Sequence, residues 1–509
     1  MFRLLELLGG LALITDLGTG APLEESLKRA VVATRLARAG GCTSEETVDV
    51  LYTSLLEHLG CTAAAHEGAQ VWGDDIALVR NALLTDFTDP RDVWRTYVHG
   101  MAESTGRSKA ALAVTGLTAG RKAEAPSMTA TCETAREASR RLGLAPSVQD
   151  ALFHLLTMWN GKGRPAVARE AIPLPTRVMH VATVATMFAL LTGPATAVEQ
   201  VRRRAGTYLD PALVDVFLDH ADELLAGLDE IDPYDELLAL EPDPVCLVTG
   251  EQVEQVARTF GDLADLKSPW LHGHSSGVAD LAATAGKHLA LDDVRSLRLA
   301  GHLHDLGKVA VSSRIWDKVG SLTATEREQA RLHAYHGERV LARVPALAAV
   351  ADLVGRHHER VDGSGYHRGL GVTQLSLPAR VLAAADTYRS LVEDRPHRPA
   401  LCPADATDRL RQEVRDGHLD GDAVAAVLAA AGLSTGLRRS RPAGLTERQV
   451  EVLCLVASGL SNQEIAKRLV ISRRTAEHHV QDAYLKIGAS SRAAAALYAM
   501  EHGLLTKPG

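Results

Sequence analysis

The sequence predicts an all-α protein, and three observations support this. The chain has 509 residues, which is too many for one hydrophobic core and indicates about three domains. It is rich in alanine and leucine, only 4% of its residues are aromatic, and few of its segments alternate polar and apolar residues as strands do. Residues 1–228 and 265–432 share short motifs in the same order, which indicates two related helical bundles in tandem.

Charge and cysteine content restrict the class of protein. The net charge of −8 gives no general attraction to nucleic acid, so DNA binding requires a local basic surface. The apolar start, Leu4–Ile14, is too short to span a bilayer and lacks the basic leader and cleavage site of a signal peptide. Six scattered cysteines without paired spacing favour a reduced setting over a disulfide framework. We therefore expect a cytoplasmic protein with no membrane contact.

The segment His302–Lys308 carries the main chemical motif. His304 and Asp305 are adjacent, and Lys308 follows about one helical turn later on the same face. An imidazole beside a carboxylate suits a transition metal that also binds water, and a nearby lysine suits an anionic substrate. The dipeptide alone is weak evidence. Further histidines and acids strengthen it, at the positions His274, His333, His357, His358 and Asp386.

The order of these motifs points to a known family. His333 lies in a His-x-x-x-Gly motif, His357-His358 precedes Asp362-Gly363-Ser364-Gly365-Tyr366, and Arg380 precedes Asp386. The set resembles the HD-GYP family of metal-dependent phosphodiesterases over residues 265–432. The resemblance implies two metal ions bridged by an aspartate and a solvent oxygen. It also implies hydrolysis of cyclic di-GMP to linear pGpG or GMP, with a related cyclic dinucleotide left open.

The resemblance assigns roles to individual residues. The implied metal ligands are His274, His304, Asp305, His333, His357, His358 and Asp386. Asp305 is the implied bridge, and Asp305 and Lys308 are the implied catalytic residues, with Lys308 stabilising phosphate charge. Imidazole and carboxylate ligands without cysteine favour iron or manganese over zinc. The implied substrate-binding residues are Lys308, Arg360, Asp362, Gly363, Gly365, Tyr366 and Arg380.

Some of these assignments have alternatives or depart from the family. Asp362 could equally cap the turn that Gly363 continues. The family's Gly-Tyr-Pro ends in His367 here, and the acid that usually follows the counterpart of Asp386 by three places is Arg389. These departures leave the metal ligands intact and place the substrate preference in doubt.

The N-terminal half resembles a second HD-GYP unit that has lost its metal ligands. Trp159–Pro165 matches the segment around Gly363, and Ile172–Val178 matches the segment around Arg380. In place of the metal ligands stand Glu25, Glu57-His58, Thr131, Leu155-Leu156 and Thr183. One imidazole cannot hold a two-metal centre, so we expect His58 to be a core residue. The half is either a platform for pairing or binding, or a scaffold kept for stability.

The C-terminal region shows helix-turn-helix order. Residues 229–264 are an acidic, proline-containing connector, and 433–442 are a basic linker. Thr446 caps one expected helix, and Ser461 with Glu464 forms the capping box of the next. Residues 443–509 resemble a four-helix LuxR/GerE-type DNA-binding domain. A small helical protein-interaction module is the alternative.

The third helix of this domain is expected to enter the major groove with its N-terminal residues at base edges or phosphates. The predicted DNA-binding residues are Arg473, Arg474, Thr475, Glu477, His478, His479, Gln481 and Lys486. The alanine-rich segment from Arg492 to His502 suits a dimer contact. The sequence therefore predicts a cytosolic, homodimeric transcriptional regulator that binds promoter DNA. Its HD-GYP domain either hydrolyses a cyclic dinucleotide or senses it with little turnover.

Overall fold

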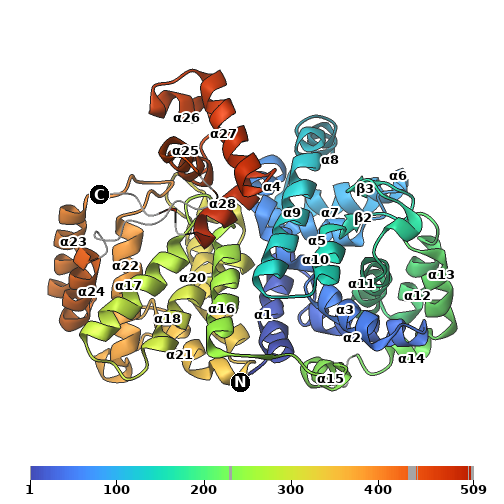
Figure 1. The fold of residues 1–509 in the computed structure, drawn as a ribbon, viewed down its shortest axis with the longest axis horizontal. Helices are drawn as coiled ribbons and strands as arrows, with labels where there is room; N and C mark the ends of the chain where they lie inside the picture. The colour runs from blue at the N-terminus through green and yellow to red at the C-terminus, as the bar shows by residue number, and fades with distance from the viewer. Residues whose placement is uncertain (1, 229–231, 434–442, 444, 503, 506–509) are drawn as a thin grey trace. The chain divides into compact units, whose positions relative to one another are not determined.

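The computed structural model describes residues 2–228, 232–433, 443, 445–502 and 504–505 (Figure 1). The chain divides into two compact units, Met1–Val253 and Glu254–Gly509. Within the described residues, regular structure is almost entirely helical, and the strands are four segments of two residues each. The predicted all-α class is confirmed. The basic linker falls largely on residues 434–442, which lie outside the described part of the chain.

The first unit is a helical bundle with two small antiparallel strand pairs, β1 with β4 and β2 with β3. Its α-helices and strands are β1 (Phe2–Arg3), α1 (Leu4–Thr19), α2 (Glu25–Ala39), α3 (Ser44–Leu55), α4 (Ala65–Trp72), α5 (Asp75–Leu84), α6 (Pro90–Asp92), α7 (His99–Thr105), α8 (Lys109–Thr115), α9 (Arg121–Arg141), α10 (Pro146–Phe153), β2 (Leu156–Thr157), β3 (Gly163–Arg164), α11 (Leu174–Thr192), α12 (Pro194–Arg203), α13 (Pro211–Asp219), α14 (Ala221–Leu225), α15 (Pro233–Leu240) and β4 (Leu247–Val248).

Helix α11 lies at the centre of the first unit and packs against α2, α3 and α12. Its residues from Val178 to Met187 are all buried, as expected for a helix that is apolar on every side. By length and composition α11 could cross a membrane, and among the described residues it is the one helix that passes that test. Because 67% of its apolar window is buried within the protein, its hydropathy is that of a core helix.

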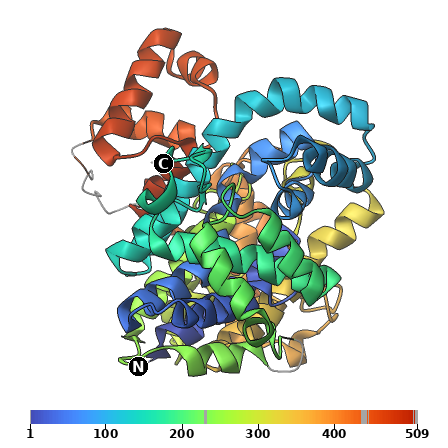
Figure 2. The ribbon, with the colours of Figure 1, turned by 90° about the vertical axis from the view of Figure 1, so that its right-hand side faces the viewer.

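Helices α8 and α9 are joined through the π-helical segment η3 (Gly116–Gly120). Figure 2 shows them, in cyan to teal, as one long helical run. The C-terminal part of α9 packs against η1 (Glu57–Ala64), a 3₁₀ segment that carries Glu57 and His58. This contact places the Glu-His pair inside the bundle.

The second unit contains a helical bundle followed by four helices of the C-terminal domain. Its α-helices are α16 (Gly250–Asp265), α17 (His274–His288), α18 (Val294–Leu303), α19 (Ser313–Trp316), α20 (Ala324–Leu341), α21 (Ala348–Arg356), α22 (Leu377–Leu391), α23 (Pro403–Arg415), α24 (Gly421–Leu433), α25 (Glu447–Ala457), α26 (Asn462–Leu469), α27 (Arg473–Ile487) and α28 (Arg492–Glu501). Helix α17 packs against α18, α22 and α24.

Three local details recur in both bundles and support the predicted duplication. Asp16 accepts hydrogen bonds from the backbone and hydroxyl of a serine ten residues later, and so does Asp265. A Cβ at Gly60 would collide with the carbonyl oxygen of Thr131, and one at Gly307 with that of His333. Arg177 and its counterpart Arg380 each bind a backbone carbonyl and an aspartate.

The predicted connector, residues 229–264, contributes to folded structure. In it, α15 packs against α1 and α2, and β4 pairs with β1. Helix α16 begins at Gly250 and is amphipathic, with residues such as Val253, Val256 and Phe260 buried. The prolines of this stretch interrupt the helices, but the stretch itself packs against the rest of the protein.

The C-terminal helices follow the predicted helix-turn-helix order. Ser461 and Glu464 form the predicted capping box at α26, and Thr446 forms another with Gln449 at α25. Helix α25 packs against α27 and α28. The alanines from Ala493 to Ala496 on α28, predicted as a dimer contact, are buried within this chain.

Candidate metal centre

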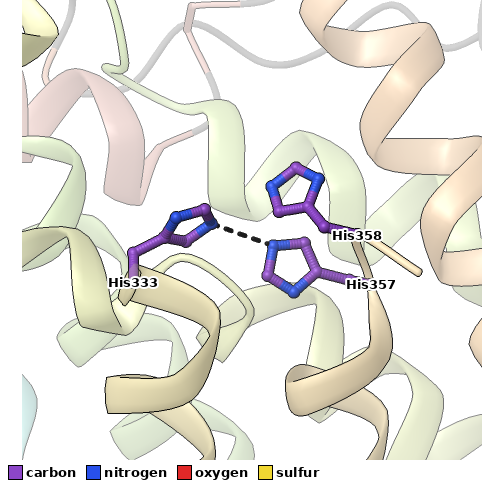
Figure 3. A group of neighbouring side chains, drawn as sticks. All are labelled: His333, His357 and His358. Atoms are coloured by element: carbon purple, nitrogen blue, oxygen red, sulfur yellow. Dashed lines mark hydrogen bonds between the residues drawn. The ribbon is translucent and has the colours of Figure 1, made fainter. Parts of the chain in front are cut away.

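The seven predicted metal ligands come together in the second unit. His274 is the first residue of α17, His304 and Asp305 follow α18, and His333 lies within α20. His357 and His358 follow α21, and Asp386 lies on α22. Figure 3 shows His333, His357 and His358 turned toward one another, from α20 and from the end of α21. All seven are buried except His358, which is half-buried.

Asp305 lies between two sets of imidazoles. Its Oδ2 is 3.2 Å from His304 Nε2 and 3.5 Å from His274 Nε2. Its Oδ1 is 3.5 Å from His333 Nε2 and 3.9 Å from His357 Nε2. A carboxylate whose two oxygens face different ligand sets has the arrangement required of a bridge between two cations.

The outer ligands complete two groups. His274 Nε2 is 3.1 Å from Asp386 Oδ1, and with His304 these residues form a group able to hold one ion. His333, His357 and His358 form a second such group, and His333 Nε2 lies 3.2 Å from His357 Nε2. The Nε2 atom of His304 is buried without a hydrogen-bond partner, so a cation would satisfy it. The donor set therefore fits two divalent ions.

The electrostatics match this donor set. Burial, together with neighbouring imidazoles, lowers the pKa of His357 to about 3, and burial lowers that of His333 to about 4. Burial opposes charge on His304, but Asp305 and Asp386 outweigh it and raise its pKa to about 10. Burial also opposes charge on Asp305, but His304 and Lys308 hold its pKa well below the usual range. Metals require neutral imidazoles and ionised carboxylates, so His333, His357 and Asp305 are already in the ligand form, whereas His304 would release a proton on binding a metal.

Lys308 lies beside the bridging carboxylate. Its Nζ forms an ion pair with Asp305 Oδ2 and lies 5.3 Å from the centroid of the Trp316 ring. Trp316 in turn donates from Nε1 to the Lys308 carbonyl oxygen at 3.2 Å and meets His333 edge-on. These contacts hold the lysine beside Asp305, and its role toward phosphate stays a prediction.

The segment after the histidine pair forms a tight loop beside the centre. Tyr366 stacks on His358 with ring centroids 4.7 Å apart, and Arg331 lies over Tyr366 at 5.2 Å. A Cβ at Gly365 would collide with the backbone of Glu359, so this glycine allows the loop to fold back on itself. Gly363 has φ +82° and serves the turn.

Three residues predicted to bind substrate form hydrogen bonds with other groups of the protein. Asp362 accepts from the backbone and hydroxyl of Ser364, which is the turn-capping role. Arg360 donates to the Glu359 carbonyl oxygen at 3.1 Å. Arg380 donates to Asp420 and to two backbone carbonyls at 2.9–3.0 Å. Because Arg177 makes the same kind of contacts in the first unit, the structure gives Arg380 a structural role, and its contact with phosphate stays a prediction.

Sequence reasoning missed two acids. Glu359 is buried and accepts from the backbone N–H groups of Arg368 and Leu370, which fixes the loop. Glu393 accepts from His274 Nδ1 at 2.7 Å and pairs with Arg395. Glu359 directly follows the histidine pair, which was a usable signal. Glu393 lies 119 residues from His274, and no local pattern connects them.

The corresponding centre of the first unit contains a buried arginine. Arg29 is fully buried and forms an ion pair with Glu25, and its Nε lies 3.1 Å from Glu57. Its Nη1 is 2.9 Å from His58 Nε2, and Thr183 Oγ1 donates to Glu57 at 2.6 Å. In the part of the chain that the structure describes, all residue groups able to hold a metal lie in the second unit.

The predicted DNA-binding residues lie on α27. Arg474, Thr475, His478 and Gln481 are exposed, and Arg473 pairs with Glu477 at 2.8 Å. The Ser472 side chain caps the helix by accepting from the backbone N–H of Thr475. His479 is half-buried, and Lys486 donates to Gln449. The first two turns of α27 thus offer two arginines and several polar groups.

Comparison with known proteins agrees with this geometry. Residues 258–423 match the family model described as HD domain, and residues 443–499 match that of bacterial regulatory proteins of the luxR family. The 3′3′-cGAMP-specific phosphodiesterase 3 of Vibrio cholerae is 28% identical over 439 residues, which are 85% of this chain and 95% of that protein. A cyclic di-GMP phosphodiesterase of Pseudomonas aeruginosa is 39% identical over 163 residues, which are 31% of this chain and 39% of that protein.

A solved structure extends the likeness over both bundles. The crystal structure of a cyclic GMP-AMP-specific phosphodiesterase of V. cholerae matches with a TM-score of 0.58 at 25% identity, over 85% of this chain and 98% of that one. This chain therefore contains a region that matches the HD domain model and a region that matches the luxR-family model, and the relatives named above are phosphodiesterases of cyclic dinucleotides.

Proposed function

We propose that this chain hydrolyses a phosphodiester bond of a cyclic dinucleotide and couples that site to promoter binding by its C-terminal domain. The observation that carries the enzymatic part is the position of Asp305 between two imidazole sets. An ordinary structural carboxylate needs only one such set of partners. Two sets around one acid suit a pair of ions that share a ligand.

In this proposal some residues would bind the two metal ions, and Lys308 would stabilise the charge of the phosphate. His274, His304 and Asp386 would hold one ion, His333, His357 and His358 the other, and Asp305 both. Two such ions, when bound, supply a hydroxide at neutral pH and neutralise phosphoryl oxygens. Lys308, anchored to Asp305, presents its positive charge to the phosphate. Because the ligands include no cysteine, we propose iron or manganese in preference to zinc.

The first substrate candidate is 3′3′-cGAMP. The relative that acts on it, by its name, matches 85% of this chain. Cyclic di-GMP, the substrate expected from the sequence, is the second candidate, because a relative named for it is 39% identical over 163 residues. His367 replaces the proline of the family motif beside Tyr366, and this departure concerns the loop next to the centre.

A direct assay tests the enzymatic proposal. Purified full-length protein loaded with Mn²⁺ or Fe²⁺ is incubated with each dinucleotide, and linear products are separated by chromatography. We expect a linear dinucleotide from at least one substrate, and none above background from Asp305→Ala. Equal background hydrolysis by both proteins would contradict the proposal for these substrates.

A ligand-gated regulator with little turnover is the second candidate function. The luxR-type domain on the same chain favours it, because a sensor needs only differential binding in two states. Dinucleotide that binds the Mn²⁺-loaded protein stoichiometrically, is recovered intact and changes promoter affinity would support this candidate over the enzyme.

The DNA-binding part is tested on α27. We expect double-stranded promoter DNA to bind through the exposed start of that helix. Arg474→Ala should weaken binding by about 1–3 kcal/mol if the arginine contacts a base edge. Arg411→Ala, which removes an exposed arginine from α23, is the matched control and should leave binding unchanged. We further propose a cytoplasmic homodimer, which sedimentation with and without DNA tests.

A further inference from the structure

His274 differs from the other buried histidines of the centre in how its ring is held. In His304, His333 and His357, Nδ1 donates to the carbonyl oxygen three residues earlier, at 2.6–2.9 Å. Such a bond fixes the tautomer and leaves the Nε2 lone pair free for a metal. His274 is the first residue of α17, and the carbonyl three residues before it accepts from the backbone N–H of His274 itself. Its ring therefore needs an acceptor from elsewhere.

Glu393 supplies that acceptor. Its Oε2 lies 2.7 Å from His274 Nδ1, and its side chain is only 17% exposed. Two arginines hold the carboxylate, Arg389 at 2.7 Å and Arg395 at 3.1 Å. Arg395 also donates to the Trp270 carbonyl oxygen, in the loop that leads into α17. The acid is thus tied both to α22 and to the loop that begins the histidine's own helix.

The backbone near Glu393 leaves room for one of its arginine partners. A Cβ at Gly277 would collide with the guanidinium of Arg389, so this glycine makes room for the arginine over α17. Arg389 stands where the resembled family has an acid, and here it pairs with Glu393 one turn later.

We propose that Glu393 is the positioning residue of His274, fixing the tautomer and ring orientation that present Nε2 to the metal. The proposal rests on the proposed function, because it requires His274 to be a ligand. A carboxylate behind a metal-bound imidazole orients it and raises its basicity, and its removal weakens metal binding about 10–100-fold. The orienting bond, the two arginine partners and the glycine gap all point to this role.

Metal titration of the full-length protein tests the proposal. Metal-free protein is titrated with Mn²⁺, and free Mn²⁺ is followed by electron paramagnetic resonance. We expect Glu393→Ala to raise the Kd of the weakened site about 10–100-fold. Glu393→Gln retains an acceptor of the same length and should recover most of the affinity. Glu393→Asp keeps the charge but loses the reach, and should bind more weakly than the glutamine variant.

Glu413 offers a matched control. It accepts from His418 Nδ1 at 2.8 Å and pairs with Arg409 at 2.7 Å, the same type of set outside the metal-capable groups. Glu413→Ala should leave Mn²⁺ affinity unchanged. Thermal unfolding in the presence of a chelator checks that each variant folds, and if Glu393→Ala does not fold, the glutamine and aspartate variants decide.

The possible outcomes distinguish the positioning role of Glu393 from the proposed metal centre on which it rests. If His274→Ala weakens Mn²⁺ binding and Glu393→Ala does not, the positioning role is wrong. If Glu393→Asp binds more tightly than Glu393→Gln, charge alone matters and the role is again wrong. If the wild type binds Mn²⁺ no better than Asp305→Ala, the metal centre itself, and not only Glu393, is wrong.

Discussion

The two bundles place different side chains at equivalent central positions. In the second unit, imidazoles and carboxylates surround a space suited to metal ions. In the first, the guanidinium of Arg29 lies among Glu25, Glu57 and His58. Two glutamates stand where the second unit has histidines. The centre of the first unit therefore contains the negative charges of Glu25 and Glu57 and the positive charge of Arg29. The comparison teaches that a bundle without a group of residues able to hold a metal can still keep a buried, charged centre.

The framework around the two centres is shared. The pairs Asp16–Ser26 and Asp265–Ser275 form the same hydrogen bonds, although only the second lies beside a candidate metal ligand, His274. Because this framework does not depend on metal, changes at the central residues can be compared between the units.

The largest difference should appear when the central residue of each unit is changed. Asp305→Ala should reduce dinucleotide hydrolysis at least about 10³-fold, because a group that acts with all the other ligands is lost. His58→Gln, at the equivalent position of the first unit, should leave turnover within about twofold, since a single essential centre accounts for activity. Steady-state assays on metal-loaded proteins measure both. A comparable loss in His58→Gln would break the comparison.

Arg29→Met should destabilise the first unit by about 3–5 kcal/mol, because Glu25 and Glu57 then remain buried without their partner. Hydrogen exchange of α2 and α3 measures the loss locally. Adding Glu25→Gln and Glu57→Gln to the arginine change should restore part of the stability, since neutral groups need no counter-charge. A loss below about 1 kcal/mol in the single variant would mean that the arginine is not the stabilising cation.

The fold and the clustering of the candidate ligands could be predicted because their signals are ordered along the chain. Asp305 adjoins His304, and the histidine pair precedes a glycine-rich loop, so motif order selected residues that the structure brings together. The role of Arg29 could not be predicted, because an arginine one turn after Glu25 reads as an exposed helical pair. Its burial depends on Glu57 and Thr183, which come from distant segments. The hydrogen bonds of Arg380 could not be predicted for the same reason, because its partner Asp420 lies 40 residues away.

Chelation should affect the two units unequally. If metals bind only the second unit, each site occupied at 100 times its Kd stabilises the folded state by about 2.7 kcal/mol. A chelator should therefore increase hydrogen exchange in α17 and α22 and leave α2 and α11 unchanged. Zinc, manganese and iron can be compared in the same experiment. Equal effects in both units would indicate a metal site that the first bundle was not expected to have.

Rising pH should weaken the first unit. Burial and Arg29 oppose charge on His58, but Cys61, Glu25 and Glu57 outweigh them and raise its pKa to about 10. A raised folded-state pKa contributes stability that is complete below about pH 6.5 and lost as the pH rises toward 10. Asp16, whose pKa burial raises to about 7, acts in the same direction at lower pH. The slope between pH 7 and 10 should be shallower in His58→Gln, as hydrogen exchange of α2 measures.

The smallest effects should come from the two equivalent arginines. Arg177→Met and Arg380→Met each remove hydrogen bonds to a backbone carbonyl and to an aspartate, and should each destabilise their own unit by about 1–2 kcal/mol. Arg380→Met should leave the KM for the dinucleotide unchanged if its role is structural. A rise in KM without a loss of stability would instead assign Arg380 to phosphate recognition. The two variants together therefore distinguish a structural role that both units share from a substrate-binding role found only in the second unit.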